Sequence, residues 1–167
     1  MADADDATTQ LQSALAEQLA DRLAVQDVVV RYFELVDAKA WDRMHEVLTD
    51  DTTARWTPEV LVQGRDRIVA ATQHMIASDE IVTHHLVAAM TPVVDGDTAE
   101  VTARVRAMHH GVGPREGKFY ESLGVQPTRL ARTPDGWRIA HHEWHATVKL
   151  GSLDDLFAPE LAAGKKH

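Results

Sequence analysis

The chain has 167 residues, of which 44% are hydrophobic, and this size and composition fit one compact domain with a core and a pocket. Its 17 basic and 26 acidic side chains give a formal charge of -9, which offers no clustered positive surface for nucleic acid or an anionic membrane. Cysteine is absent, which excludes disulfides and thiolate chemistry, and no apolar run approaches membrane-spanning length. We therefore expect a soluble cytoplasmic protein, with neither nucleic acid nor membrane as a partner.

Helical periodicity dominates the first half of the chain. Leucines recur at every fourth position from residue 11 to residue 23, and the apolar stripe continues to Val36. This pattern predicts one long helix, or two with a bend, that ends near Asp37. A second, short helix is expected around residues 41–48, and a third over residues 65–76.

Strand-like composition takes over after residue 80. Four runs rich in valine, threonine and aromatic residues follow one another, at residues 81–94, 98–110, 118–132 and 137–150. Asp-Gly turns at residues 94–98 and 133–137 join neighbouring runs as hairpins. Helices followed by hairpin-linked strands predict an α+β fold, with the helices packed on one face of a strongly curved antiparallel sheet.

The order of these elements, together with "VDAKAWDRM", "THHLVAAM", "VDGDTAEV" and "TPDGWRIAHHEW", resembles the SnoaL-like branch of the nuclear transport factor 2-like superfamily. Within it, the chain is similar to the scytalone and bile acid dehydratases over roughly residues 20–158. The resemblance implies a single domain over residues 1–167, with a helical extension at 1–20 and a C-terminal tail or lid at 152–167. It also implies a cone-shaped antiparallel or mixed sheet around a deep apolar pocket, and a homo-oligomer, either a dimer or a trimer.

An aspartate, a histidine and a tyrosine are the first candidate catalytic residues. A histidine can move a proton at neutral pH, a carboxylate can orient it, and a tyrosine can donate a hydrogen bond to an oxyanion. The resemblance assigns these positions to Asp37, His85 and Tyr32. Strand alternation alone leaves the choice between His84 and His85 open, because adjacent residues point to opposite faces. Without the resemblance, Asp37 reads as a helix-end acid and Tyr32 as a core residue.

The second histidine doublet gives conflicting signals. Ala103, Val105 and Ala107 alternate in register with His109, which favours His109 for the inner face. The spacing from His85, however, matches the second catalytic histidine of scytalone dehydratase to His110. We expect His110 to be the acid that protonates a departing hydroxyl.

The remaining pocket residues are expected to be mostly apolar. Trp56 stands where the related dehydratases have a second tyrosine, and its indole can donate a hydrogen bond but cannot act as an acid. We also expect Val36, Val87 and Met108 to contact the substrate. The resemblance also implies that Phe157 belongs to an apolar lid in the tail, although a terminal helix packed on the sheet explains the same segment equally well.

The last strand offers a different chemistry. His141, Glu143 and His145 alternate and therefore share a face, where two histidines could hold a metal; a polar outer face is the competing interpretation.

We predict that the protein uses no metal and no cofactor. We expect it to be an acid–base lyase, namely a dehydratase of an activated cyclic or polyketide-like hydroxy carbonyl compound. There are two alternatives. One is a polyketide cyclase or isomerase that uses the same Asp–His dyad, and the other is a non-catalytic binding module.

Overall fold

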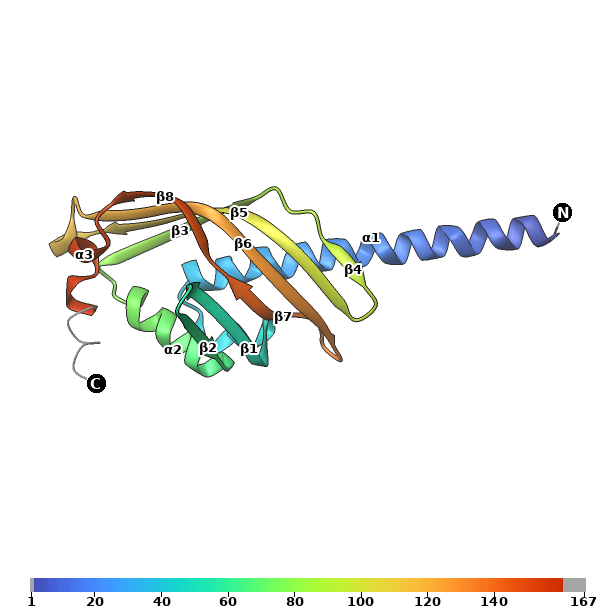
Figure 1. The fold of residues 1–167 in the computed structure, drawn as a ribbon, viewed down its shortest axis with the longest axis horizontal. Coiled ribbons are helices and arrows are strands. Elements are labelled where there is room, and N and C mark those ends of the chain that lie inside the picture. The colour runs from blue at the N-terminus through green and yellow to red at the C-terminus, as the bar shows by residue number, and fades with distance from the viewer. Residues whose placement is uncertain (1, 161–167) are drawn as a thin grey trace.

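The computed structural model describes residues 2–160, and side chains from residue 6 onward. One long helix, α1 (Ala2–Asp37), is followed by the 3-10 helix η1 (Trp41–Glu46), by α2 (Arg65–Ile76) and, near the end, by the 3-10 helix η2 (Gly113–Arg115) and the short α3 (Leu153–Leu156). Figure 1 shows the first half of α1 extending beyond the rest of the molecule, while its second half lies against the sheet. Within residues 2–160, no helix combines the length and apolar character needed to cross a membrane.

Eight strands form one curved, mixed sheet (Figure 1). The strands are β1 (Leu48–Thr57), β2 (Val60–Gln63), β3 (Ile81–Ala88), β4 (Val93–Asp95), β5 (Thr98–Gly111), β6 (Phe119–Thr133), β7 (Gly136–Glu143) and β8 (His145–Gly151). Their order is β2-β1-β7-β6-β5-β3, with β4 added to β5 and β8 added to β6. All pairs are antiparallel except β1 with β7, which are parallel.

The core lies between the concave side of this sheet and the second half of α1. Val25, Val29 and Val36 are buried at helical spacing, and they meet the inward residues of the strands. By contrast, the leucines at every fourth position of the projecting half are exposed: Leu11, Leu15, Leu19 and Leu23. Among the described side chains, burial of apolar surface therefore stabilises the second half of α1.

The predicted fold class is confirmed, as are both Asp-Gly hairpins. Asp95 pairs with Thr98 across the first turn, and Thr133 pairs with Gly136 across the second. The third helix begins and ends as expected. The sheet is mixed and wraps a cavity together with the helices, which agrees with the cone implied by the family resemblance.

The prediction was wrong between residues 41 and 63. The expected second helix is a short 3-10 helix, and Leu48 already begins β1, which pairs with β2. Thr52 and Ala54 alternate into the interior with the period of a strand. Too few apolar residues mark this strand for the pattern to be visible in the sequence.

Two of the expected strands are each divided in the structure. The run over residues 81–94 breaks after Ala88, where Ala89 has a positive φ of 53°. The run over residues 137–150 breaks at Trp144, which separates β7 from β8. A Cβ atom on Gly124 would lie 2.1 Å from the carbonyl oxygen of His145, so glycine is required for β8 to approach β6 this closely.

Candidate active site

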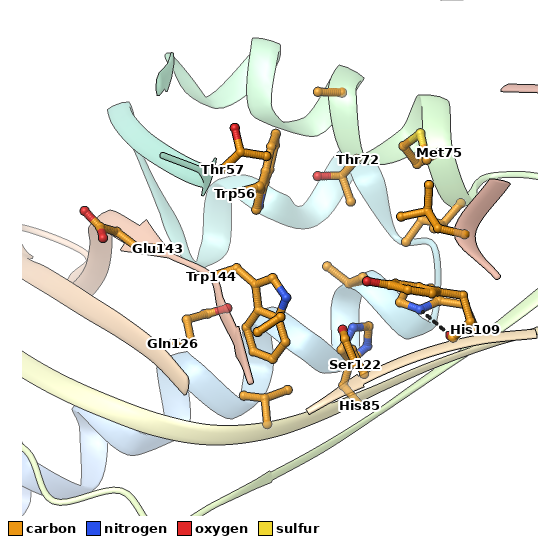
Figure 2. A pocket seen from close by; sticks show the side chains of 18 of the residues that line it. Trp56, Thr57, Thr72, Met75, His85, His109, Ser122, Gln126, Glu143 and Trp144 are labelled. Carbon is orange, nitrogen blue, oxygen red and sulfur yellow. Dashed lines mark hydrogen bonds between the residues drawn. The ribbon is translucent and has the colours of Figure 1, made fainter. Parts of the chain in front are cut away.

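A cavity of about 1140 Å³ lies between α1, α2 and the concave face of the sheet. Its wall is mainly aromatic and apolar, with a few polar side chains that Figure 2 shows in place. The lining residues include Tyr32, Phe33, Val36, Trp56, Met75, His85, His109, Ser122, Gln126, Trp144 and Phe157. A large apolar cavity with a small number of polar groups is typical of a small-molecule site.

The C-terminus of α1 places Asp37 beside β3. The helix ends in a Schellman-type turn, in which Lys39 has a positive φ of 52° and the amide of Ala40 donates to the carbonyl of Leu35. The Lys39 ammonium donates to the carbonyls of Ser78 and Ile81, at 2.6 and 3.1 Å. The end of the helix is therefore tied to the beginning of the strand that carries His85.

Asp37 holds His85 through both carboxylate oxygens. Oδ1 lies 2.6 Å from the imidazole Nδ1, and Oδ2 accepts a hydrogen bond of 2.8 Å from the backbone amide of His85. The His85 side chain is only 8% exposed, and the ring of Phe33 packs beside it with 4.9 Å between ring centres. The expected contact between Asp37 and His85 is present, and two separate bonds fix its geometry.

The electrostatics of this pair determine which nitrogen of His85 is free. Burial raises the pKa of Asp37, but hydrogen bonds and the charge interaction with His85 outweigh burial and leave that pKa below its ordinary value. Asp37 is therefore ionised at neutral pH and accepts the proton that Nδ1 carries. In neutral His85, Nε2 then has a lone pair, and it forms no hydrogen bond within the described residues.

His109 also lines the cavity, beside His85. Its ring lies edge-on to that of His85, with 5.7 Å between centres, and its Nδ1 lies 3.3 Å from the carbonyl oxygen of Tyr120. Burial, reinforced by the charge of His85, lowers the pKa of His109 to about 4. His109 is thus neutral at pH 7, and because a carbonyl can only accept, Nδ1 carries the proton and Nε2 is an acceptor.

The placement expected for His110 was wrong. Its side chain is 51% exposed and bonds through Nε2 to Glu121 at 2.9 Å, outside the cavity lining. His109 shares the buried face of Ala107 instead, so alternation was the better guide than the spacing taken from the family. Met108 shares the parity of His110 and does not line the cavity either.

Most of the other residues expected to line the cavity do so, but one does not. Tyr32, Val36, Trp56 and Phe157 line the cavity, whereas Val87 packs against the hydrophobic core outside it. The expectation that Val87 contacts a substrate was therefore wrong, although it lies on the same face of β3 as His85.

Tyr32 is buried, and this burial raises its pKa, so its hydroxyl remains protonated. That hydroxyl forms no hydrogen bond within the described residues and is free to donate into the cavity. The ring of Tyr32 lies 5.2 Å, centre to centre, from that of His142, a fully buried histidine. Neither ring nitrogen of His142 has a hydrogen-bond partner in the described part of the chain, and burial lowers its pKa to about 4.

Sequence reasoning missed Ser122, Gln126 and Trp144 as lining residues. Ser122 and Gln126 are inward residues of β6, and both are buried. The two-residue period of that strand could have predicted that these two residues share a face. Because both side chains are polar, however, the sequence did not indicate that this face lines the cavity. The position of Trp144 depends on the break between β7 and β8, which the sequence did not reveal.

His141 and Glu143, near the end of β7, and His145, at the start of β8, form a hydrogen-bonded group. Nε2 of His141 and Nε2 of His145 lie 3.0 and 2.8 Å from the two carboxylate oxygens of Glu143. Hydrogen bonds from both histidines lower the pKa of that carboxyl. Among residues 2–160, no group of three histidine, cysteine or acidic side chains is arranged to hold a metal ion.

Comparison with known proteins places this geometry in a family. The model of the SnoaL-like domain matches residues 17–143. An uncharacterized protein of Mycobacterium tuberculosis is 28% identical over 124 residues, which cover 73% of this chain and 82% of the relative.

Solved structures share the fold at low sequence identity. Kfla4162 of Kribbella flavida superimposes with a TM-score of 0.75 at 22% identity, covering 83% of this chain and 98% of its own. A provisionally named scytalone dehydratase of Novosphingobium aromaticivorans gives 0.72 at 16% identity, covering 81% and 89%. A hexachlorocyclohexane dehydrochlorinase of Novosphingobium barchaimii gives 0.71 at 14% identity, covering 82% and 93%. The chain belongs to the SnoaL-like domain family.

Proposed function

We propose that this protein is a cofactor-independent acid–base lyase, a dehydratase of a small, activated cyclic or polyketide-like hydroxy carbonyl compound. The observation that carries the proposal is the double contact of Asp37 with His85 at the wall of a large apolar cavity. An imidazole with an ionised carboxylate behind Nδ1, and with no hydrogen bond to Nε2 from the described residues, is the arrangement of a general base. It also stabilises the imidazolium that forms when the base takes a proton.

In the first step, Nε2 of His85 removes a proton from the carbon next to the substrate carbonyl. The electrons of the broken C–H bond move into the carbonyl group and give an enolate. Asp37 stabilises the resulting imidazolium, and the hydroxyl of Tyr32 donates a hydrogen bond to the enolate oxygen. General acid–base catalysis supplies roughly 10² to 10⁴ in rate, about 3 to 5 kcal/mol, so the substrate must itself be activated.

In the second step, the enolate electrons form the C=C bond and the C–O bond to the hydroxyl breaks. The departing oxygen needs a proton, and neutral His109 has none to give from Nε2 while its Nδ1 faces the carbonyl of Tyr120. We infer that the His85 imidazolium returns its proton to this oxygen, which leaves as water and regenerates the base. His109 then accepts a hydrogen bond from the substrate hydroxyl and orients it. Because one group serves both steps, elimination takes place on one face of the substrate.

The named relatives support an elimination reaction as the class. Two structures of the same fold carry the names scytalone dehydratase and hexachlorocyclohexane dehydrochlorinase, and both names describe removal of a small molecule from the substrate. A cyclase or an isomerase would use the same dyad to form an enolate and would differ only in what the enolate does next. A binding module would not need the dyad at all.

The test is turnover of cyclic β-hydroxy ketones, beginning with 3-hydroxycyclohexanone and 3-hydroxy-1-tetralone, followed by mass spectrometry. We expect loss of water with the wild-type protein and with His84→Gln, and none above background with His85→Gln or Asp37→Asn. Products of unchanged mass that depend on His85 would favour an isomerase. Turnover that is equal in the folded dyad variants and the wild type would remove the proposal.

A further inference from the structure

Gln126 has a buried amide nitrogen without a partner among the described residues. The residue is 4% exposed, its Nε2 forms no hydrogen bond within residues 2–160, and it lines the cavity. An amide buried without a hydrogen bond destabilises a fold, and an apolar side chain of similar size would avoid that cost. Such a group is retained more readily where a ligand completes its hydrogen bonds.

The strand register separates Gln126 from the dyad. On β5, Ala107 faces both His85 of β3 and Ser122 of β6, so these three residues form one row across the sheet. Gln126 lies four residues farther along β6, roughly 13 Å from that row at the usual rise of a strand. In Figure 2, Gln126 and Trp144 occupy one side of the cavity, and His85, Ser122 and His109 occupy the other.

Trp144 is the neighbour of Gln126 at this end. Val125 is paired with His145 and Thr128 is level with His142, which brings Gln126 opposite Trp144 where β7 gives way to β8. Directly opposed residues of antiparallel strands share a face, so the indole and the amide project into the same part of the cavity. An aromatic surface beside an amide suits a ring that carries an oxygen substituent.

We propose that Gln126 and Trp144 form a second subsite, which binds an oxygen-bearing ring of the substrate at the end of the cavity away from His85. The amide accepts through Oε1 from a hydroxyl and, once a ligand turns the side chain, donates through Nε2 to a phenolic or carbonyl oxygen, while the indole covers the ring. The proposal rests on the proposed function, because the dyad defines the reacting end. It specifies the substrate class as an elongated hydroxy carbonyl compound with at least two rings and an oxygen group on the far ring.

Binding of two matched probes tests the subsite. We would measure the Kd of 6-hydroxy-1-tetralone and of 1-tetralone by calorimetry; the probes share a carbonyl and differ only in the far hydroxyl. We expect the hydroxylated probe to bind about tenfold more tightly to the wild type, the scale of one neutral hydrogen bond in a buried site. Gln126→Leu should remove this preference and leave the Kd of 1-tetralone nearly unchanged. Gln126→Met provides the same test if the leucine variant does not fold.

Control variants separate this subsite from the dyad and from Ser122. Ser122→Ala and Asp37→Asn should keep the tenfold preference. The proposal would be overturned if the wild type showed no preference for the hydroxylated probe, or if a folded Gln126 variant kept that preference. It would also be overturned if Ser122→Ala alone abolished the preference. If the protein bound the hydroxylated probe more tightly in a Gln126-dependent way and yet dehydrated no hydroxy ketone, that result would support the subsite and contradict only the proposed dehydratase activity.

Discussion

The two faces of strands β3 and β5 carry the same residue type in opposite roles. His85 and His109 face the cavity, and their ring nitrogens meet a carboxylate and a backbone carbonyl. On the other face, His84 is exposed and His110 bonds to Glu121 beside the ring of Phe119. The chemistry of each histidine therefore depends on the strand face that it occupies and on the group that hydrogen-bonds to its ring. A doublet in the sequence is therefore one candidate site and one surface residue, not a pair of ligands.

A second contrast exists within the cavity itself. His85 is backed by a carboxylate that is ionised at neutral pH, whereas His109 is backed by a neutral carbonyl and its pKa is about 4. Only the first arrangement stabilises an imidazolium. The two inner histidines are therefore expected to divide the work into proton transfer by His85 and hydrogen-bond acceptance by His109.

Substitution of the dyad should give the largest effect. His85→Gln and Asp37→Asn should each lower kcat on a true substrate by roughly 10²- to 10⁴-fold, the range expected for loss of a general base. Because the two residues act as one unit, the double variant should lose little more than either single variant. Steady-state kinetics on variants shown to be folded by circular dichroism would measure this. Losses that multiply in the double variant would show that Asp37 and His85 act independently.

Substitution of Tyr32 tests what helix α1 contributes to catalysis in the cavity besides Asp37. Tyr32→Phe removes only a hydroxyl that has no hydrogen bond within the described residues, so the fold should keep its melting temperature. Loss of a donor to the enolate oxygen should lower kcat by roughly 10²-fold. An unchanged kcat, measured on the same substrate, would assign Tyr32 to the packing of the cavity wall.

Acid should destabilise the protein through its buried histidines. The pKa of His109 and that of His142 lie at about 4, below the ordinary 6.5. An unfolded chain therefore binds protons more readily than the folded one, and stability falls as pH decreases from 6.5 toward 4. Each histidine contributes on the order of 3 kcal/mol to that loss. Chemical denaturation of the wild type and of His142→Phe at several pH values would measure the difference.

His84→Ala is the matched control for this prediction, because its side chain is exposed. It should leave the slope of stability against pH unchanged, while His142→Phe makes the slope shallower. Equal slopes for His142→Phe and the wild type would mean that His142 gains a partner in solution.

The outer histidines should give the smallest effects. His84→Gln and His110→Gln should each change kcat by less than about twofold, because neither side chain reaches the cavity. A loss at His110 comparable to that at His85, in a folded variant, would reverse the assignment of faces. This comparison needs only relative rates and one substrate.

How far the sequence predicted the site depended on the kind of signal. The position of Asp37 followed from the end of a periodic helix and a family match, and the register of β3 brings His85 to it. For the second doublet, the buried alternation of Ala103, Val105 and Ala107 predicted His109 correctly, whereas the spacing taken from a relative misled. Distances counted along a chain do not survive insertions, but the two-residue period of a strand does.

Other features could not be predicted because they depend on tertiary pairing. β1 carries few apolar residues, and its identity as a strand depends on pairing with β2 and β7. The unpartnered amide of Gln126 is visible only once every neighbour is placed. Local patterns therefore predicted the helices and hairpins, while the mixed sheet and the far end of the cavity required the assembled fold.

The most direct test of the central claim is hydrogen exchange at carbon, with no leaving group involved. We would incubate 1-tetralone with the protein in D₂O and follow the loss of the C2–H signal by proton NMR. If His85 is the base and Asp37 supports it, the wild type and His84→Gln should accelerate this exchange, and His85→Gln and Asp37→Asn should not. Exchange with the wild type that is no faster than with folded His85→Gln would contradict the account.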